Sequence, residues 1–369
     1  MPGNGGEDIK FVDGYVFFCG SYNDSLNGES GCIGYLGLSD LTSSLVTSVN
    51  ITYRLIPQSK ILTKLVAYRD ESGRLSAVAI GTSHSSLNPH MIVHFPEIQT
   101  NYFYNIVEMG VDAATGEMDF LFEVLEIGDN IVFTGKDFLL LDNPMYIRVT
   151  DKNDVFYNPS FDTIHIYQSD PFEVNARIYS TDIDGRFIAM AYVKNAPLYT
   201  FPYSTMLRTI DVNTKMMIAS QAIPSGDKFE PEDITYLPLT QKVALLQYQA
   251  NIGLGYDYRI ALLNPWALSS YNINRLFFAN EELSSISNFL GKYYIARGPD
   301  RWYLQDSGNL SYAGGGCPLK DQFPVDVPVN LVHDCVVDVR TVNVFLSPFY
   351  YFTSIKSSIP IPTECSLTN

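Results

Sequence analysis

The sequence predicts an all-β fold in which one antiparallel sheet is repeated along the chain. Aromatic residues are mostly Tyr (25) and Phe (22), with only two Trp, a composition that suits pleated, half-buried strands. In addition, the stretch VDGYVFFCG at 12–20 returns as IGDNIVFTG at 127–135. Both stretches have a tight turn, a run of large apolar residues, a small residue and a glycine. With 369 residues, 46% of them hydrophobic, the chain is long enough to bury a large core.

The repeated stretch has five further copies. Together with the copies at Tyr15 and Ile131 there are seven, 49 to 60 residues apart, and the others begin at Leu75, Phe187, Val243, Tyr293 and Val342. Periods of this length are typical of architectures in which each repeat is one small sheet. The nearly continuous apolar character of each copy predicts a strand buried on both faces.

Each copy is predicted to be the second strand of a four-stranded unit. An alternating strand such as EDIKFV at 7–12 precedes it, and a strand such as MIVHF at 91–95 and a more polar stretch such as DTIHIYQ at 162–168 follow it. Hairpin turns are predicted between the first and second strands. These turns are DG at 13–14, SG at 72–73, GDN at 128–130, DG at 184–185 and GK at 291–292.

Seven such units predict a seven-bladed β-propeller of four-stranded antiparallel blades, forming a single domain over residues 1–369. At this point the chain resembles the β-propeller superfamily over essentially all its length. Its DI-x-x-x-DGY-apolar style is similar to that of uncharacterised secreted or lipoprotein-type propellers of gut bacteria. The WD dipeptide and the paired glycines of kelch repeats are absent. Two stacked β-sandwich domains are the alternative, and six or eight blades also remain open.

Two groups of residues are candidates for ligand binding. Aromatic side chains of the predicted loops between second and third strands (21–30, 194–204 and 249–258) form the first group: Tyr199, Phe201, Tyr203, Tyr256 and Tyr258. Such aromatics stack on sugar rings or bind a protein surface, although packing back on the blades is the alternative. The second group lies where innermost strands begin and consists of Asp8, Asp233 and Asp334. These carboxylates would line a negatively charged channel mouth, or they are solvated turn acids.

These residues predict a non-catalytic binding or scaffold module that recognises a glycan or a protein surface. The alternative is a carbohydrate-active hydrolase or lyase that uses carboxylates at the channel mouth. No GxSxG or HExxH motif is present, and no cofactor is predicted. His84, His90 and His94 lie within eleven residues, but surface histidines around a strand are the favoured interpretation, so no metal site is predicted.

Charge and cysteine content limit the partners and the location. The net charge is −16 with a pI of about 4.6, and Lys and Arg are scattered, which argues against nucleic acid. No apolar run approaches the roughly 20 residues of a transmembrane helix, and MPGNGGEDIK does not read as a signal peptide. We expect a secreted or cell-surface protein supplied in processed form, with a cytoplasmic location as the alternative. Cys317, Cys335 and Cys365 lack any CxxC spacing, and Cys19 and Cys32 form either a disulfide or two buried thiols.

Overall fold

The computed structural model describes 28 strands and, among the described residues, no helix. The described residues are 5–24, 28–37, 48–84, 90–99, 103–109, 119–137, 145–153, 160–168, 178–195, 203–224, 230–251, 255–266, 271–278, 283–289, 292–297, 301–305, 325–327, 330–331, 335–343, 350–351 and 354–360. The chain divides into two compact units. Unit 1 comprises residues 1–140, 147–163 and 340–369, and unit 2 comprises residues 141–146 and 164–339. The predicted all-β class is confirmed.

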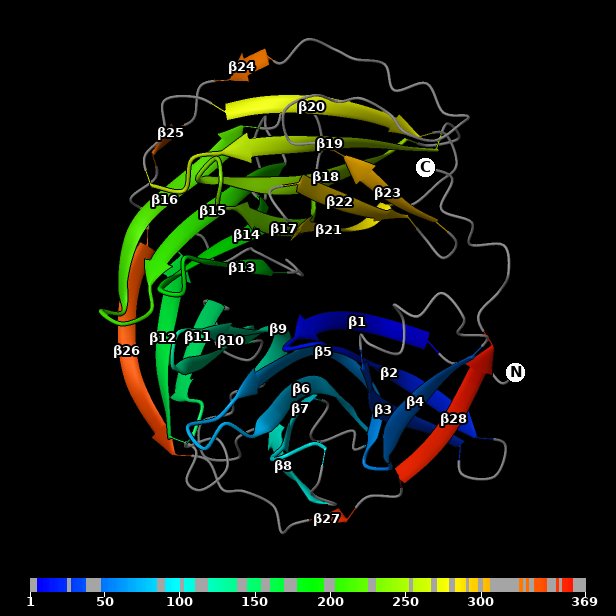
Figure 1. The fold of residues 1–369 in the computed structure, drawn as a ribbon. Helices are drawn as coiled ribbons and strands as arrows, with labels where there is room; N and C mark the ends of the chain where they lie inside the picture. The colour runs from blue at the N-terminus through cyan, green and yellow to red at the C-terminus, as the bar shows by residue number, and fades with distance from the viewer. Residues whose placement is uncertain are drawn as a thin grey trace. The chain divides into compact units, whose positions relative to one another are not determined.

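Unit 1 contains two complete antiparallel sheets, each of four consecutive strands plus one strand from the C-terminal region. The first sheet has the order β1 (Gly5–Val12), β2 (Tyr15–Asp24), β3 (Gly28–Gly37), β4 (Ser48–Ile56) and β28 (Ser354–Pro360). The second sheet consists of β5 (Ser59–Arg69), β6 (Leu75–Ser83), β7 (His90–Phe95), β8 (Phe103–Met109) and β27 (Tyr350–Tyr351). Figure 1 shows β28, in red, lying along β4.

A third sheet begins in unit 1, and the boundary between the two units crosses its later strands. It consists of β9 (Asp119–Ile127), β10 (Asn130–Asp137), β11 (Met145–Asp151), β12 (Ser160–Gln168) and β26 (Cys335–Asn343). Within unit 1, β5 lies beside both β1 and β9. The first strands of successive sheets are therefore neighbours.

Unit 2 repeats this arrangement with three sheets. The first has the order β13 (Tyr179–Ile183), β14 (Phe187–Asn195), β15 (Tyr203–Asp211), β16 (Met216–Pro224) and β25 (Asn330–Leu331). The second consists of β17 (Glu230–Leu237), β18 (Lys242–Asn251), β19 (Gly255–Leu263), β20 (Tyr271–Phe278) and β24 (Val325–Val327). The third has three strands, β21 (Leu283–Phe289), β22 (Lys292–Arg297) and β23 (Arg301–Gln305). Here β17 lies beside both β13 and β21.

The C-terminal region differs from the sequence prediction. Val342 was expected in the second strand of a seventh sheet, but it lies in β26, at the edge of the sheet that contains β12. The described residues thus form six sheets. An apolar alternating stretch does not reveal whether its partners are local or distant, and here the partner strand is far away in the chain. Pro360 ends β28 at the outside of its sheet, where proline is tolerated because no ladder partner needs its N–H.

The hairpin turns follow the glycine pattern of the sequence. Val12 pairs directly with Tyr15 across Asp13 and Gly14, whose φ angles are 47° and 80°. Two positive φ angles define the turn type that matches strand twist and that favours Asp-Gly. Ile127 and Asn130 enclose a second two-residue turn. The predicted turn at 291–292 lies only partly within the described residues.

The second strands lie inside the sheets, between the first and third strands, and are buried, as predicted. Phe17, Ile131, Ala189 and Leu245 have no exposed surface. In unit 1, Phe17 packs in one apolar cluster with residues of β3, β5 and β6. Burial on both faces explains why these strands lack polar alternation.

The connections between second and third strands are shorter than predicted. Strand β2 extends to Asp24 and β3 begins at Gly28, and β18 extends to Asn251 with β19 beginning at Gly255. Tyr22 pairs with Ser30, and Ala250 pairs with Tyr256. These stretches were predicted to be loops, but cross-strand pairing continues through both of their ends.

Candidate functional site

The predicted aromatic residues divide into three groups. Tyr199 and Phe201 lie outside the described residues. Tyr203 begins β15, and Tyr256 lies in β19, so both belong to strands and not to loops. Tyr258, two residues further along β19, is only 3% exposed.

A row of directly paired residues crosses the sheet at Tyr258. Glu230 of β17 pairs with Tyr248 of β18, and Tyr248 pairs with Tyr258 of β19. The Tyr248 hydroxyl donates to Glu230 Oε2 at 3.2 Å. The rings of Tyr248 and Tyr258 lie 6.4 Å apart, centroid to centroid, tilted by 36°. We call Glu230, Tyr248 and Tyr258 the tyrosine row.

Burial changes along the tyrosine row. Tyr258 belongs to the apolar cluster between this sheet and Ile286 of β21, while Tyr248 packs at its margin and is half-buried, as is Glu230. Burial, with the nearby Glu230 carboxylate, raises the pKa of Tyr248 to about 12. The phenol is protonated at neutral pH, and its proton is donated to Glu230. A supported ring with a phenol and a carboxylate at its edge suits a polyhydroxylated ligand.

Sequence reasoning missed Tyr248 and Glu230. Tyr248 lies in the second strand, where apolar runs predict core and not a site, and Glu230 stands two residues before the alternating stretch EDITYL at 232–237. One signal was available in the sequence. The apolar run of this strand changes to the polar residues of LLQYQ near its end, and this end pairs with the stretch that contains Tyr258.

The predicted channel acids Asp8 and Asp233 make the same kind of hydrogen bonds, each in its own unit. Asp8 Oδ1 accepts from its neighbour Ile9 N at 2.9 Å, and Oδ2 accepts from Leu65 N of β5 at 3.0 Å. In the other unit, Asp233 Oδ1 accepts from Ile234 N and Oδ2 from Ile286 N of β21, both at 2.8 Å. Each carboxylate therefore joins the first strands of two successive sheets. Asp334 lies outside the described residues.

Both aspartates follow a β-bulge at the same place in the first strand. The register shifts between Gly6 and Asp8 and between Pro231 and Asp233. Corresponding shifts put Lys64, Glu123 and Ser285 at the position after the bulge in three other sheets. Lys64 Nζ and Glu123 Oε1 form an ion pair at 2.9 Å between β5 and β9. A bulge re-aims the side chain beside it, and here it directs a polar group toward the next sheet.

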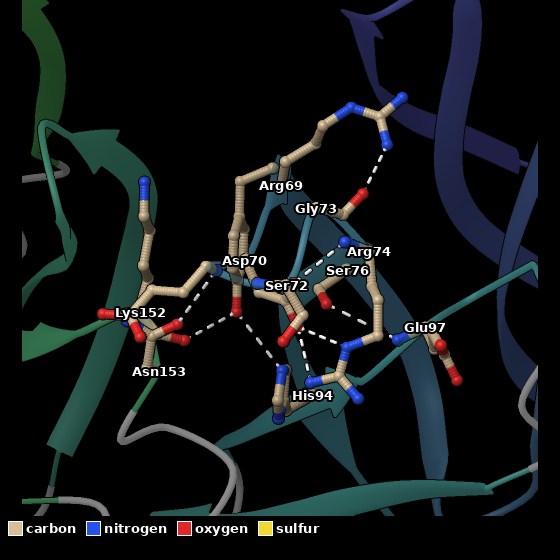
Figure 2. Close-up of polar contacts among 12 residues, drawn as sticks. Arg69, Asp70, Ser72, Gly73, Arg74, Ser76, His94, Glu97, Lys152 and Asn153 are labelled. Carbon is tan, nitrogen blue, oxygen red and sulfur yellow. Dashed lines mark hydrogen bonds and ion pairs between the residues drawn. The ribbon is translucent and has the colours of Figure 1, made fainter.

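A second polar cluster lies in unit 1 around residues 70–74, the turn between β5 and β6 (Figure 2). Asp70 Oδ1 accepts from Ser72 N and Arg74 N, both at 2.9 Å, and Oδ2 accepts from Arg74 Nε at 2.7 Å. Burial alone raises the pKa of Asp70, but the bonds from Arg74 and Ser72 outweigh it and lower the pKa below its ordinary value. Asp70 thus stabilises the turn as a carboxylate.

The same cluster contains a buried hydrogen-bond relay. The Tyr68 hydroxyl lies 3.2 Å from His94 Nε2 and donates to the Lys152 carbonyl at 3.1 Å. Since the hydroxyl has one proton, its oxygen accepts from His94, which assigns the Nε2–H tautomer to this ring. His94 is 4% exposed, and burial lowers its pKa to about 3. The relay connects β7 through β5 to the end of β11.

The three clustered histidines do not converge. His94 faces Tyr68, whereas His84 is exposed, with Nε2 3.0 Å from the Glu29 carbonyl. His90 pairs with Thr82. Among the residues the structure describes, no three His, Cys, Asp or Glu side chains are arranged to hold a metal ion.

The cysteine alternative is resolved in favour of thiols for the first pair. Cys19 pairs with Ile33 and Cys32 with Gly20, so the two side chains lie on opposite faces of the sheet. Both thiols are free and buried, and burial raises the pKa of each; that of Cys32 rises to about 11. They are poor nucleophiles at neutral pH.

Comparisons with known proteins provide no family assignment. No protein-family model matches the sequence, and a search of curated proteins finds no match. In the described part of the chain, no helix has the length and apolarity to span a membrane.

Proposed function

We propose that the chain is a non-catalytic recognition module on a β-propeller scaffold and that it binds a glycan at the tyrosine row. The observation that carries the proposal is the Tyr248 phenol, hydrogen-bonded to Glu230 and packed against Tyr258. An aromatic face covers the C–H face of a sugar, and phenol and carboxylate groups bind its hydroxyls.

The propeller scaffold is supported by the repeated arrangement of the sheets. In five of the six described sheets four consecutive strands pair as antiparallel neighbours, and first strands lie beside first strands within each unit. The described sheets favour six blades over the seven predicted from sequence. In a closed propeller every sheet is covered on both faces. Ile9 and Phe11 on β1, which are 44% and 65% exposed, would be covered by such closure.

The counterparts of Ile9 and Phe11 show what closure would do. Leu65 and Ala67 occupy the same places after the bulge of β5, and both are buried in the cluster shared with Phe17 of the preceding sheet. In unit 2, Ile234 and Tyr236 of β17 are buried with Ala189 and Leu207 of the preceding sheet. The repeat therefore assigns an apolar cover to Ile9 and Phe11.

The hydrolase alternative has less support than recognition. A glycosidase needs two carboxyl groups that flank the scissile bond. Asp8 and Asp233 instead bind backbone N–H groups with both oxygens. The extracytoplasmic location stays a prediction, and the free thiols of Cys19 and Cys32 add nothing to it.

A glycan array combined with an assay for released reducing sugar tests this function. We expect labelled protein to bind a defined set of glycans without releasing sugar from the corresponding polysaccharides. Release of sugar would replace the proposal with the hydrolase. Absence of both signals would contradict glycan recognition and direct the search to protein partners.

A further inference from the structure

Strand β4 carries a C-terminal strand, β28, along its outer edge. Of the C-terminal strands whose residue pairing is known, β28 has the most paired residues. All seven residues of β28, Ser354–Pro360, pair with Ser48–Arg54 without a shift in register. By comparison, β24 pairs through three residues, and β25 and β27 through two each. The β4–β28 ladder is thus a substantial antiparallel interface made of backbone groups.

Strand β28 belongs to the first sheet but is far in sequence from its other four strands. Strands β1 to β4 follow one another in sequence, and β28 comes about 300 residues later (Figure 1). Among the described strands of its sheet, β28 neighbours β4 alone. A terminal strand held at one edge makes the same hydrogen bonds whether it belongs to its own chain or to an identical chain.

We propose that the β4 edge is a strand-acceptor site and that two copies of the chain exchange β28 across it. The partner is a second copy, because Ser354–Pro360 is the sequence whose register on β4 is already defined. Each copy gives one strand and receives one, so the exchange closes at two copies.

The sequence of β28 favours closure over open-ended growth. The strand contains Lys356 and ends at Pro360. Lysine and proline on an edge strand hinder further strand addition, because the charge resists burial and proline lacks an N–H donor. By contrast, β4 is rich in β-formers, with Val49, Ile51 and Tyr53 alternating along it.

Cysteine cross-linking between two tagged versions of the full chain tests the exchange. One version carries Asn50→Cys and the other Ser358→Cys, since these residues are direct partners. Both versions also carry Cys317→Ser, Cys335→Ser and Cys365→Ser and keep the buried Cys19 and Cys32. They are co-expressed, purified, oxidised and resolved on a non-reducing gel. Direct partners in an antiparallel ladder lie within disulfide distance.

The control replaces Ser358→Cys with Lys356→Cys, whose partner is Thr52. This diagonal pair lies too far apart for a disulfide. We expect a species carrying both tags at several-fold the level of the control. A second control is a single chain that carries both Asn50→Cys and Ser358→Cys. If this double variant cross-links within one chain but the two-tag level equals the control, the exchange is overturned. Failure of that double variant as well would overturn the strand pairing and the proposal together.

Discussion

At the scale of single residues, polar side chains join one sheet to the next. Asp8 and Asp233 lie in different units, yet both accept one N–H from the following residue and one from the adjacent first strand. The relay of His94, Tyr68 and the Lys152 carbonyl joins the second sheet, which contains β5 and β7, to the third sheet, which contains β11. These groups offset the cost of burying backbone donors and acceptors at positions where the ladders end.

We predict that Asp8→Asn lowers the free energy of unfolding by about 1–3 kcal/mol. The amide is uncharged and has one acceptor oxygen, so it cannot replace the carboxylate that accepts two N–H bonds. Urea unfolding at neutral pH measures this loss. The matched control is Glu7→Gln, which changes the adjacent exposed residue. Equal stability of the two variants would show that the link to Leu65 N contributes nothing.

Acid sensitivity is predicted for His94. Its folded pKa of about 3 lies below the unfolded value of about 6.5. The unfolded chain therefore binds more protons between these pH values, and stability falls as pH decreases through this range. Asp70, the nearby carboxylate, opposes the shift but does not reverse it. From pH 7 to pH 4.5 the loss due to this group is roughly 2–3 kcal/mol.

Urea unfolding of His94→Gln across this pH range checks the prediction. We expect the variant to lose stability less steeply than the unmodified chain. The exposed His84, changed to Gln, provides the control and should keep the original slope. Parallel curves for all three proteins would contradict a buried, neutral His94.

At the scale of elements, local features were predictable and distant pairings were not. The Asp13-Gly14 turn and the buried strand of Phe17 follow from residues that are adjacent in sequence. Val342 was misassigned because its alternation fits a central strand as well as the edge strand β26. Tyr258 was predicted in a loop but lies buried in β19, and Tyr248 and Glu230 become its neighbours only when three strands pair in register. Asp8 and Asp233 were recognised as equivalent, while the bulge that directs them was not.

The second strand of the first sheet is an element that should be sensitive to substitution. Phe17→Asp should prevent stable folding, because Phe17 is fully buried and the charge would have no partner there. Circular dichroism and soluble yield measure the effect. A soluble variant with a cooperative unfolding transition would contradict the position of this strand in the core.

At the scale of the whole molecule, the repeat makes closure testable through β1. Phe11 is 65% exposed in this structure, whereas its counterparts Ala67 and Tyr236 are buried. If the sheets form a closed propeller, Phe11→Asp should destabilise the chain by several kcal/mol, as expected for a charge placed in an apolar interface. Urea unfolding that leaves the variant within about 0.5 kcal/mol of the original would identify a surface position and contradict closure.

The tyrosine row is tested most directly by the affinity for a glycan identified on the array, measured by calorimetry for the unmodified chain and two variants. Tyr248→Ala removes the ring and the phenol. Tyr22→Ala removes a half-buried tyrosine from the corresponding end of the first sheet, where it packs 5.7 Å from Tyr53. We predict at least a tenfold weaker Kd for Tyr248→Ala, equivalent to about 1.4 kcal/mol, and an unchanged Kd for Tyr22→Ala. Equal affinities for all three proteins, with both variants folded, would show that the glycan binds elsewhere.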